Sequence, residues 1–378
     1  MKLVPEHVRE LGSYVQGTPL PRYQRGARPG CIKLASNENP LGPSPLAIRG
    51  MQEAIERCSF YPDNDTNELR QALARRHRVS REQILVGAGS TEILGVICRT
   101  LLKPGLNAIT SERSFIMYPI VTAAVGARII TVPMRDDAFD LEAIAAAVNS
   151  STRVIFLANP NNPTGTAFDA EALNKFLAKI PGTITLILDE AYYEFADAFA
   201  TMRGVEYSRA LDQVKARRNL VVLRSFSKIH GLAGLRVGYG IGPPELIGYF
   251  SRMRTTFSVS TIAQAAALAA MRDGHHIRRT LANNSEGAKQ LVDELSKMGQ
   301  SVTPTWTNFL YCELGEDANC VGARLQSEGV IIRPLTVWGA PTAIRVTIGT
   351  PQQNEKFLRA FKKVRANGLL SKRSVPAY

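Results

Sequence analysis

The sequence predicts an α/β protein in which a large domain with a mainly parallel sheet precedes a smaller α+β domain. Short apolar runs typical of buried strands alternate with helical patterns between about residues 80 and 245, as in a sheet with helices on both faces. Four of these strands end in polar turns, and the pattern changes after residue 250. A chain of 378 residues is also long enough for two domains.

The first polar strand end follows Ile84-Leu85-Val86. This run leads through Gly87-Ala88-Gly89 to a hydroxyl pair, Ser90-Thr91, and then to a helix with apolar residues at Ile93, Leu94, Ile97 and Leu101. Free backbone amides at a helix N-terminus attract phosphate, and glycines let the backbone come close to it. Because Gly-x-Gly also occurs in ordinary turns, this motif has weight only together with others.

The second and third strand ends carry amide and carboxylate side chains. The strand at 154–157 runs into Asn159-Pro160-Asn161-Asn162-Pro163-Thr164-Gly165, and the strand at 185–188 runs into Asp189-Glu190-Ala191-Tyr192. Taken alone, the first motif indicates a tight turn and Asp189 indicates a residue that caps the next turn. A carboxylate at the end of a buried strand is costly without a cationic partner, which favours a positively charged ligand group.

The fourth strand end carries the most informative motif. The strand at 220–223 precedes Arg224-Ser225-Phe226-Ser227-Lys228, and Arg236 follows before a strand at 237–241. A lysine forms a Schiff base when a neighbouring cation or desolvation lowers its pKa. Ser225, Ser227 and Arg236 are suited to hold a phosphate beside that amine. An aldehyde that bonds Lys228 and carries a phosphate is pyridoxal phosphate.

A lone loop lysine is ordinarily a solvated surface charge, so this hypothesis depends on the other three strand ends. In open α/β sheets, ligands gather at the carboxyl ends of the strands. We therefore expect the four strand ends to face one ligand.

The part of the chain after residue 250 predicts the smaller domain. An alanine-rich helix is expected over 262–271, strands at 301–302 and 309–312, and a last helix that starts near Pro351 with Phe357, Phe361 and Val364 on one stripe. We expect a large domain over residues 34–250 and a small domain over 251–378.

Composition and charge limit the classes of function. Hydrophobic residues make up 45% of the chain, which indicates a globular protein. We expect no membrane contact and a cytoplasmic location, because no apolar run approaches about 18 residues and the start lacks the apolar block of a secretory signal. The five cysteines have no paired or metal-type spacing, so reduced thiols and no metal site are expected. The net charge of +13 is scattered without a recognisable binding module, so no nucleic-acid partner is expected.

These motifs make the chain resemble the fold-type I pyridoxal-phosphate aminotransferases of the histidinol-phosphate aminotransferase type. The match extends from Leu34–Pro40 and Phe60–Asp63, through the turn at 161–165 and Asp189–Tyr192, to the lysine loop and Ile344–Gly349. The resemblance implies an aspartate-aminotransferase-like large domain with a seven-stranded sheet. It also implies an N-terminal arm over residues 1–33 that packs with the small domain.

The resemblance implies a cofactor-binding role for each matching residue. Lys228 would form the Schiff base and act as the base, and Asp189 would pair with the pyridine nitrogen. Asn162 and Tyr192 would bond the phenolic oxygen. Phe115 would stack on the ring, although many relatives have Tyr there, and Thr91 stands where many have Asp. The cofactor phosphate would be held by Ser225, Ser227, Arg236, Gly89 and Ser90.

The resemblance also implies a substrate site. Arg345 would grip the anionic end of the substrate, with Arg333 as a second candidate nearby. Tyr14 and Asn39 match positions that line the substrate site. Tyr61 matches a residue that the partner subunit contributes, which implies a homodimer with shared active sites.

The implied reaction moves an amino group between L-histidinol phosphate and 2-oxoglutarate, in histidine biosynthesis. An aromatic amino-acid aminotransferase acting on phenylalanine or tyrosine is the first alternative, because Arg345 suits a phosphate or a carboxylate. A pyridoxal-phosphate lyase similar to phosphothreonine decarboxylases is the second. A non-catalytic regulator is not expected, because such proteins carry an additional DNA-binding domain and the matching pattern begins by residue 34.

Overall fold

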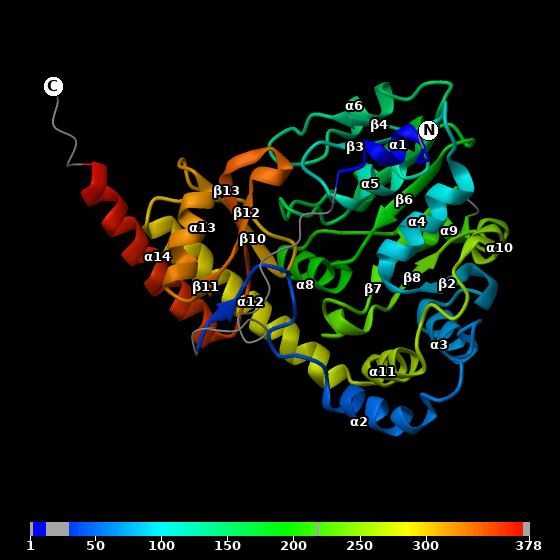
Figure 1. Ribbon diagram of the computed structural model, residues 1–378, viewed down its shortest axis with the longest axis horizontal. Coiled ribbons are helices and arrows are strands. Elements are labelled where there is room, and N and C mark those ends of the chain that lie inside the picture. The colour runs from blue at the N-terminus through cyan, green and yellow to red at the C-terminus, as the bar shows by residue number, and fades with distance from the viewer. Residues whose placement is uncertain (1–2, 13–29, 217–218, 373–378) are drawn as a thin grey trace.

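A seven-stranded sheet forms the centre of the large domain in the computed structural model, which describes residues 3–12, 30–216 and 219–372 (Figure 1). The strand order is β2-β8-β7-β6-β5-β3-β4. Strands β3 to β7 pair in parallel, whereas β8 is antiparallel to both its neighbours. The predicted, mainly parallel sheet is therefore confirmed. The strands are β2 (Ile84–Gly87), β3 (Asn107–Ser111), β4 (Arg128–Val132), β5 (Thr152–Ala158), β6 (Thr185–Asp189), β7 (Leu220–Ser225) and β8 (Gly238–Ile241).

Helices cover both faces of this sheet, which is why its strands are apolar on both sides. Along β5, Ile155 and Leu157 belong to the hydrophobic core on one face, whereas Val154 and Phe156 belong to the core on the other. The first core is closed by α3 (Asn67–His77), α6 (Leu141–Ala146), α7 (Ala170–Lys179) and α9 (Ala210–Lys215). The second is closed by α4 (Gly89–Leu101), α5 (Met117–Ala123) and α10 (Pro244–Met253).

The small domain is built on an antiparallel sheet of order β12-β13-β10-β9. Its strands are β9 (Ser301–Val302), β10 (Phe309–Glu313), β12 (Arg333–Leu335) and β13 (Ala340–Thr347). The sheet packs against α12 (Gly274–Lys297), α13 (Ala318–Ser327) and α14 (Pro351–Lys372). Phe357, Phe361 and Val364 of α14 are buried in this core, as their spacing predicts. The helix α8 (Tyr193–Arg203) contributes Phe199 to the same core.

The packing of α11 (Thr261–Arg272) differs from the predicted division at residue 250. This alanine-rich helix lies beside α2 (Pro45–Ala54) of the large domain (Figure 1). Its Ala263, Ala266, Ala267 and Ala270 belong to the large-domain core. The reason is steric: alanine and glycine allow close approach, so that a Cβ added to Gly50 of α2 would lie 3.0 Å from the Cβ of Ala269.

The N-terminal segment contacts both domains. Strand β1 (Ile32–Lys33) pairs in parallel with β11 (Val330–Ile331), which attaches it to the small domain. The short helix α1 (Glu6–Arg9) lies instead against the large domain, where His7 and Leu11 share a cavity with Pro119 and Ile120 of α5. The expectation that residues 1–33 pack with the small domain therefore does not hold for α1, because an apolar face of α5 lies beside it. Within the described ranges, each helix is too short or too polar to cross a membrane.

Substitution of Gly50 tests the close contact between α2 and α11. We expect Gly50→Leu to lower the free energy of unfolding by about 1–3 kcal/mol, because the added side chain has to displace backbone and methyl groups of α11. Gly248→Leu is the matched control, since Gly248 lies in a helix of equal length and a Cβ there would meet nothing within 4 Å. The control should gain roughly 0.5–1 kcal/mol of helix propensity. Denaturant midpoints compare the two variants, and equal midpoints would refute the contact.

Candidate active site

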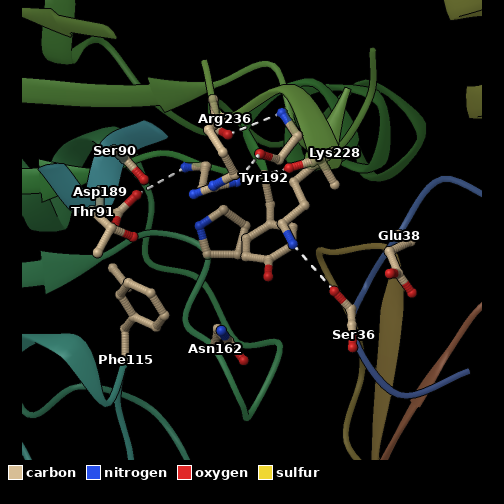
Figure 2. A pocket seen from close by; sticks show the side chains of 16 residues that line it. Ser36, Glu38, Ser90, Thr91, Phe115, Asn162, Asp189, Tyr192, Lys228 and Arg236 are labelled. Atoms are coloured by element: carbon tan, nitrogen blue, oxygen red, sulfur yellow. Dashed lines mark hydrogen bonds between the residues drawn. The ribbon is translucent and has the colours of Figure 1, made fainter. Parts of the chain in front are cut away.

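A cavity of about 280 Å³, here called the main cavity, opens at the carboxyl edge of the large sheet. Four strand ends contribute to its lining: Ser90 follows β2, Asn162 follows β5, Asp189 ends β6 and Lys228 follows β7. Figure 2 shows these side chains around one space. They meet because β2, β5, β6 and β7 run in the same direction. The strand ends that the sequence places far apart along the chain thus face a single site.

Lys228 lies on the loop after β7 and lines the main cavity. Its Nζ donates a hydrogen bond to the carbonyl oxygen of Ser36 at 3.3 Å (Figure 2). Burial lowers the pKa of this amine to about 8, and the guanidinium groups of Arg345 and Arg236 act in the same direction. A larger fraction of the amine is therefore neutral, which is the form that attacks a carbonyl.

Asp189 lines the main cavity and is only 5% exposed. The hydroxyl of Tyr118 donates to its Oδ2 at 3.2 Å, and the backbone N–H of Ala191 donates to its Oδ1 at 3.2 Å. Burial raises the pKa of Asp189 to about 6, while these two hydrogen bonds and the Lys228 ammonium oppose the rise. A cationic ligand group beside this carboxylate would favour its ionised form.

Another part of the lining of the main cavity gathers hydrogen-bond donors. Gly89 begins α4 with φ of +79°, and a Cβ there would lie 2.5 Å from Nη2 of Arg236. Arg236 Nη1 donates to the Oγ of Ser227 at 3.4 Å, and the backbone N–H of Ser227 donates to the Oγ of Ser225 at 3.0 Å. A helix N-terminus, two hydroxyls and a guanidinium in one place can bind a phosphate group.

A second cavity of about 120 Å³, here called the arginine cavity, adjoins the main cavity. Lys228, Asn162 and Tyr192 line both. Arg345 lies on β13 and donates to the Oδ1 of Asn162 at 2.5 Å and to the carbonyl oxygen of Ala35 at 2.7 Å. Arg333 lies directly opposite Arg345 on the neighbouring strand β12. Arg333 is 8% exposed and Arg345 is 6% exposed. Two buried guanidinium groups on adjacent strands repel each other, so an anion in this cavity would stabilise both.

Phe115 also lines both cavities, at their common wall. Its ring meets the edge of Tyr118 at a centroid distance of 5.6 Å and an interplanar angle of 87°. Tyr192 lies across the site, and its hydroxyl accepts a hydrogen bond from Nδ2 of Asn37 at 2.9 Å. Two aromatic rings thus border the space into which Lys228 extends.

Two of the described residues predicted for the substrate site, Asn39 and Tyr61, line neither cavity. The side chain of Asn39 donates to the carbonyl oxygen of Ile229 at 2.9 Å and to Thr280, which ties the N-terminal segment to the lysine loop. Asn37, two residues earlier, lines the arginine cavity in its place. Tyr61 is 84% exposed on the surface and stacks on Phe257 at 4.8 Å. Tyr14 lies outside the described residues.

Some residues that line the two cavities were not predicted from the sequence. Ser36 and Glu38 line the main cavity, within the Leu34–Pro40 stretch that pointed to Asn39 instead. Trp338 lines the arginine cavity, where its ring lies 5.0 Å from the Arg333 guanidinium and its Nε1 donates to the carbonyl oxygen of Ser114 at 3.0 Å. No local pattern marks Trp338. In the described part of the chain, no three His, Cys, Asp or Glu side chains are arranged to hold a metal ion.

Comparison with known proteins identifies the family. The family described as aminotransferase class I and II matches residues 29–361. The histidinol-phosphate aminotransferase 2 of Pseudomonas fluorescens (strain Pf0-1) is 43% identical over 371 residues, which cover 97% of this chain and 99% of that protein. The histidinol-phosphate aminotransferase of Moorella thermoacetica is 41% identical over 96% of this chain and 92% of its own length.

Solved structures agree with this assignment. The histidinol-phosphate aminotransferase of Sinorhizobium meliloti, in complex with pyridoxal-5'-phosphate, superposes with a TM-score of 0.89 at 29% identity, covering 97% of this chain and 98% of that one. The aspartate aminotransferase of Thermus thermophilus with maleate has a TM-score of 0.81, covering 96% of this chain and 100% of that one; at 21% identity it shows the fold alone. The predicted aspartate-aminotransferase-like fold is thus confirmed, and the chain belongs to the aminotransferase class I and II family.

Proposed function

We propose that this protein is a pyridoxal-phosphate-dependent aminotransferase that moves an amino group between L-histidinol phosphate and 2-oxoglutarate, a reaction of histidine biosynthesis. The observation that carries the proposal is that Lys228 lines both cavities, with Asp189 in one and a pair of arginines in the other. The two histidinol-phosphate aminotransferases at 43% and 41% identity support this donor over an aromatic amino acid or a decarboxylase substrate.

The donors at the start of α4 fit the phosphate of the cofactor. Ser225, Ser227 and Arg236 would hold it, together with the backbone amides of Gly89 and Ser90. The absence of a side chain at Gly89 supports this assignment, because a Cβ would crowd the guanidinium of Arg236 at 2.5 Å. A phosphate would also balance the charge of that arginine.

The remaining lining fits the ring of the cofactor. Asp189 would face the protonated pyridine nitrogen, which supplies the cation that its buried carboxylate requires. Asn162 and Tyr192 would bond the phenolic oxygen, and Phe115 would stack on the ring. When bound, pyridoxal phosphate supplies an aldehyde that condenses with amines and a ring that withdraws electrons.

Lys228 would carry the proton in the reaction. The pKa of the Lys228 amine is lowered to about 8. The amine can therefore both accept and return a proton near neutral pH. The carbonyl oxygen of Ser36 and the ring of Tyr192, 5.5 Å from Nζ, border this amine. These neighbours would keep Nζ directed at the carbon atom of the substrate that carries the amino group.

The arginine cavity would take the anionic end of each substrate in turn. Histidinol phosphate has no carboxylate, so its phosphate would occupy the site that then receives a carboxylate of 2-oxoglutarate. The planar guanidinium of Arg345 can bind either anion with two parallel hydrogen bonds. Arg333 lies directly opposite on β12 and would add a second positive charge.

The active form would be a homodimer with shared sites. Tyr61 is 84% exposed and Phe60 is 75% exposed, in the segment between α2 and α3. Ile55 is also exposed in this segment and Phe257 stacks on Tyr61, and exposed apolar side chains of this kind are typical of an interaction site. Tyr61 would reach the site of the partner subunit from this segment.

The compartment would be the cytoplasm. All five cysteines are unpaired, and Cys98 and Cys312 are buried in hydrophobic cores. Thiols of this kind persist in a reducing environment.

Replacement of Lys228 tests the position of the amine. Borohydride should remove the visible absorbance of the purified protein and attach the cofactor to Lys228, as located by peptide mass. Lys228→Ala should abolish turnover even where cofactor stays bound, because Lys228 carries the only amine among the described residues that line the main cavity. Near-normal transamination by Lys228→Ala would exclude the assignment.

Replacement of Asp189 separates catalysis from stability. Asp189→Asn should lower kcat by about 10²–10³-fold, on the scale of one lost electrostatic contact in a preorganised site. Because the pKa of Asp189 is higher in the folded chain than in the unfolded chain, ionisation of this carboxyl lowers the free energy of unfolding as pH rises through about 6. The cofactor-free variant should therefore unfold at or above the wild-type temperature at neutral pH. A lower melting temperature with unchanged kcat would instead assign Asp189 a capping role.

Replacement of Arg345 tests the shared anion site. Arg345→Lys should lower kcat/KM for both histidinol phosphate and 2-oxoglutarate by roughly 10–100-fold, because a point charge cannot replace two parallel hydrogen bonds. Arg345→Ala should nearly abolish both half-reactions. Arg203→Lys is the control, since Arg203 donates to the carbonyl oxygen of Thr305 outside both cavities. A loss confined to one substrate would show that the two anions use different sites.

Mixed dimers test the contribution of Tyr61. Neither Lys228→Ala nor Tyr61→Ala should be fully active alone. Random exchange of the two chains would give one intact site in half of the dimers, or roughly a quarter of wild-type activity. A monomer with normal turnover, or mixtures that stay inactive after verified exchange, would contradict the shared site.

A further inference from the structure

Tyr118 lines neither cavity, but it contacts Asp189 and Phe115, which line the main cavity. It is the second residue of α5 and is fully buried. Its hydroxyl donates to the Oδ2 of Asp189 at 3.2 Å, across a sequence separation of 71 residues. A group in this place can act on the site only through the residues that it contacts.

The ring of Tyr118 is fixed by two other aromatic rings. It stacks on Phe156 of β5 at 4.9 Å with an interplanar angle of 6°, and it meets the ring of Phe115 edge-on at 5.6 Å. Both arrangements are favourable for aromatic pairs. Tyr118 therefore has a rigid position and joins Asp189 to Phe115.

We propose that Tyr118 is a positioning residue for cofactor binding, whose hydroxyl orients Asp189 and holds it ionised while its ring supports Phe115. The inference rests on the proposed function and deepens it, because it concerns how this chain prepares the carboxylate for the ring nitrogen of pyridoxal phosphate. Tyr118 would not itself touch the cofactor.

The charges around Asp189 make the hydroxyl important. From the following turn, the N–H of Ala191 donates to Oδ1, and from the loop after β7 the Lys228 ammonium lowers the pKa of Asp189. Glu190, next along the chain, raises it. The Tyr118 hydroxyl is the side-chain donor on Oδ2. Burial and the nearby Asp189 raise the pKa of Tyr118 well above its ordinary value, so the phenol keeps its proton and stays a donor.

The direction of the expected effect follows from proton linkage. An ionised Asp189 can accept a protonated ring nitrogen without exchanging a proton, whereas a protonated Asp189 must first release one. Affinity for the cofactor therefore falls as pH falls through the pKa of Asp189, which burial raises to about 6. Removal of the hydroxyl raises that pKa further, so the loss of affinity should begin at a higher pH.

The test compares Tyr118→Phe with wild type in its affinity for pyridoxal phosphate. The full-length proteins are dialysed against graded pyridoxal phosphate between about pH 6 and pH 8.5, and bound cofactor is measured by its visible absorbance. At about pH 6 we expect Tyr118→Phe to bind several-fold more weakly, with the difference shrinking as pH rises. Tyr239→Phe is the matched control. It also removes a buried phenol hydroxyl from the large domain, one that bonds His77 at 3.0 Å, and it should bind as wild type does.

A double-mutant cycle distinguishes positioning from a general loss of structure. If the hydroxyl acts through Asp189, then Tyr118→Phe should change affinity little in an Asp189→Asn background. The same fold-loss in both backgrounds would overturn the inference. Wild-type affinity and pH dependence in Tyr118→Phe would also overturn it, while leaving the proposed function intact. A wild-type protein that binds no pyridoxal phosphate would remove both.

Discussion

The buried carboxylate of Asp189 is the constraint on which the rest of the site depends. It ends β6, the middle strand of the seven, and is 5% exposed. A carboxylate in this place is stable only with hydrogen-bond donors and a nearby positive charge. The structure supplies donors from Tyr118 and Ala191 and an ammonium from Lys228. A protonated ring nitrogen would complete the set, and this requirement connects the fold to the cofactor.

A buried ion pair beside Asp189 also constrains the carboxyl ends of the central strands. Glu190, next to Asp189, accepts two hydrogen bonds from Arg224, next to Ser225, at 2.8 and 3.1 Å. Both side chains are buried, and the Arg224 guanidinium also lies 3.5 Å from the centroid of the Tyr193 ring. The pair links the carboxyl ends of β6 and β7. Asp189 and Ser225, which are proposed to contact the pyridine nitrogen and the phosphate of the cofactor, therefore cannot move apart without breaking a buried ion pair.

The sequence was sufficient where local patterns decide the structure. Runs of buried strand followed by polar turns predicted that Asp189, Asn162 and Lys228 meet, because parallel strands bring their carboxyl ends to one edge. Arg345 was predicted only by resemblance, since nothing in its strand distinguishes it from a surface arginine.

Residues whose role depends on distant contacts were not predictable in this way. Asn37 and Asn39 lie in the same irregular segment between β1 and α2, and only the packing against Tyr192 and Ile229 decides which one faces the cavity. Tyr118 and Trp338 act through partners 71 and 224 residues away along the chain. The side of the molecule on which α11 packs is likewise set by tertiary contact, since its alanines suit either core.

In the proposed reaction, one site accepts an amino group from histidinol phosphate and then gives it to 2-oxoglutarate. Single-turnover absorbance of the wild-type protein with its cofactor tests this most directly. Stoichiometric histidinol phosphate should deplete the visible band, and subsequent 2-oxoglutarate should restore it, with phenylalanine at the same concentration acting much more slowly. A visible band that is unchanged by histidinol phosphate but depleted by phenylalanine would contradict the account.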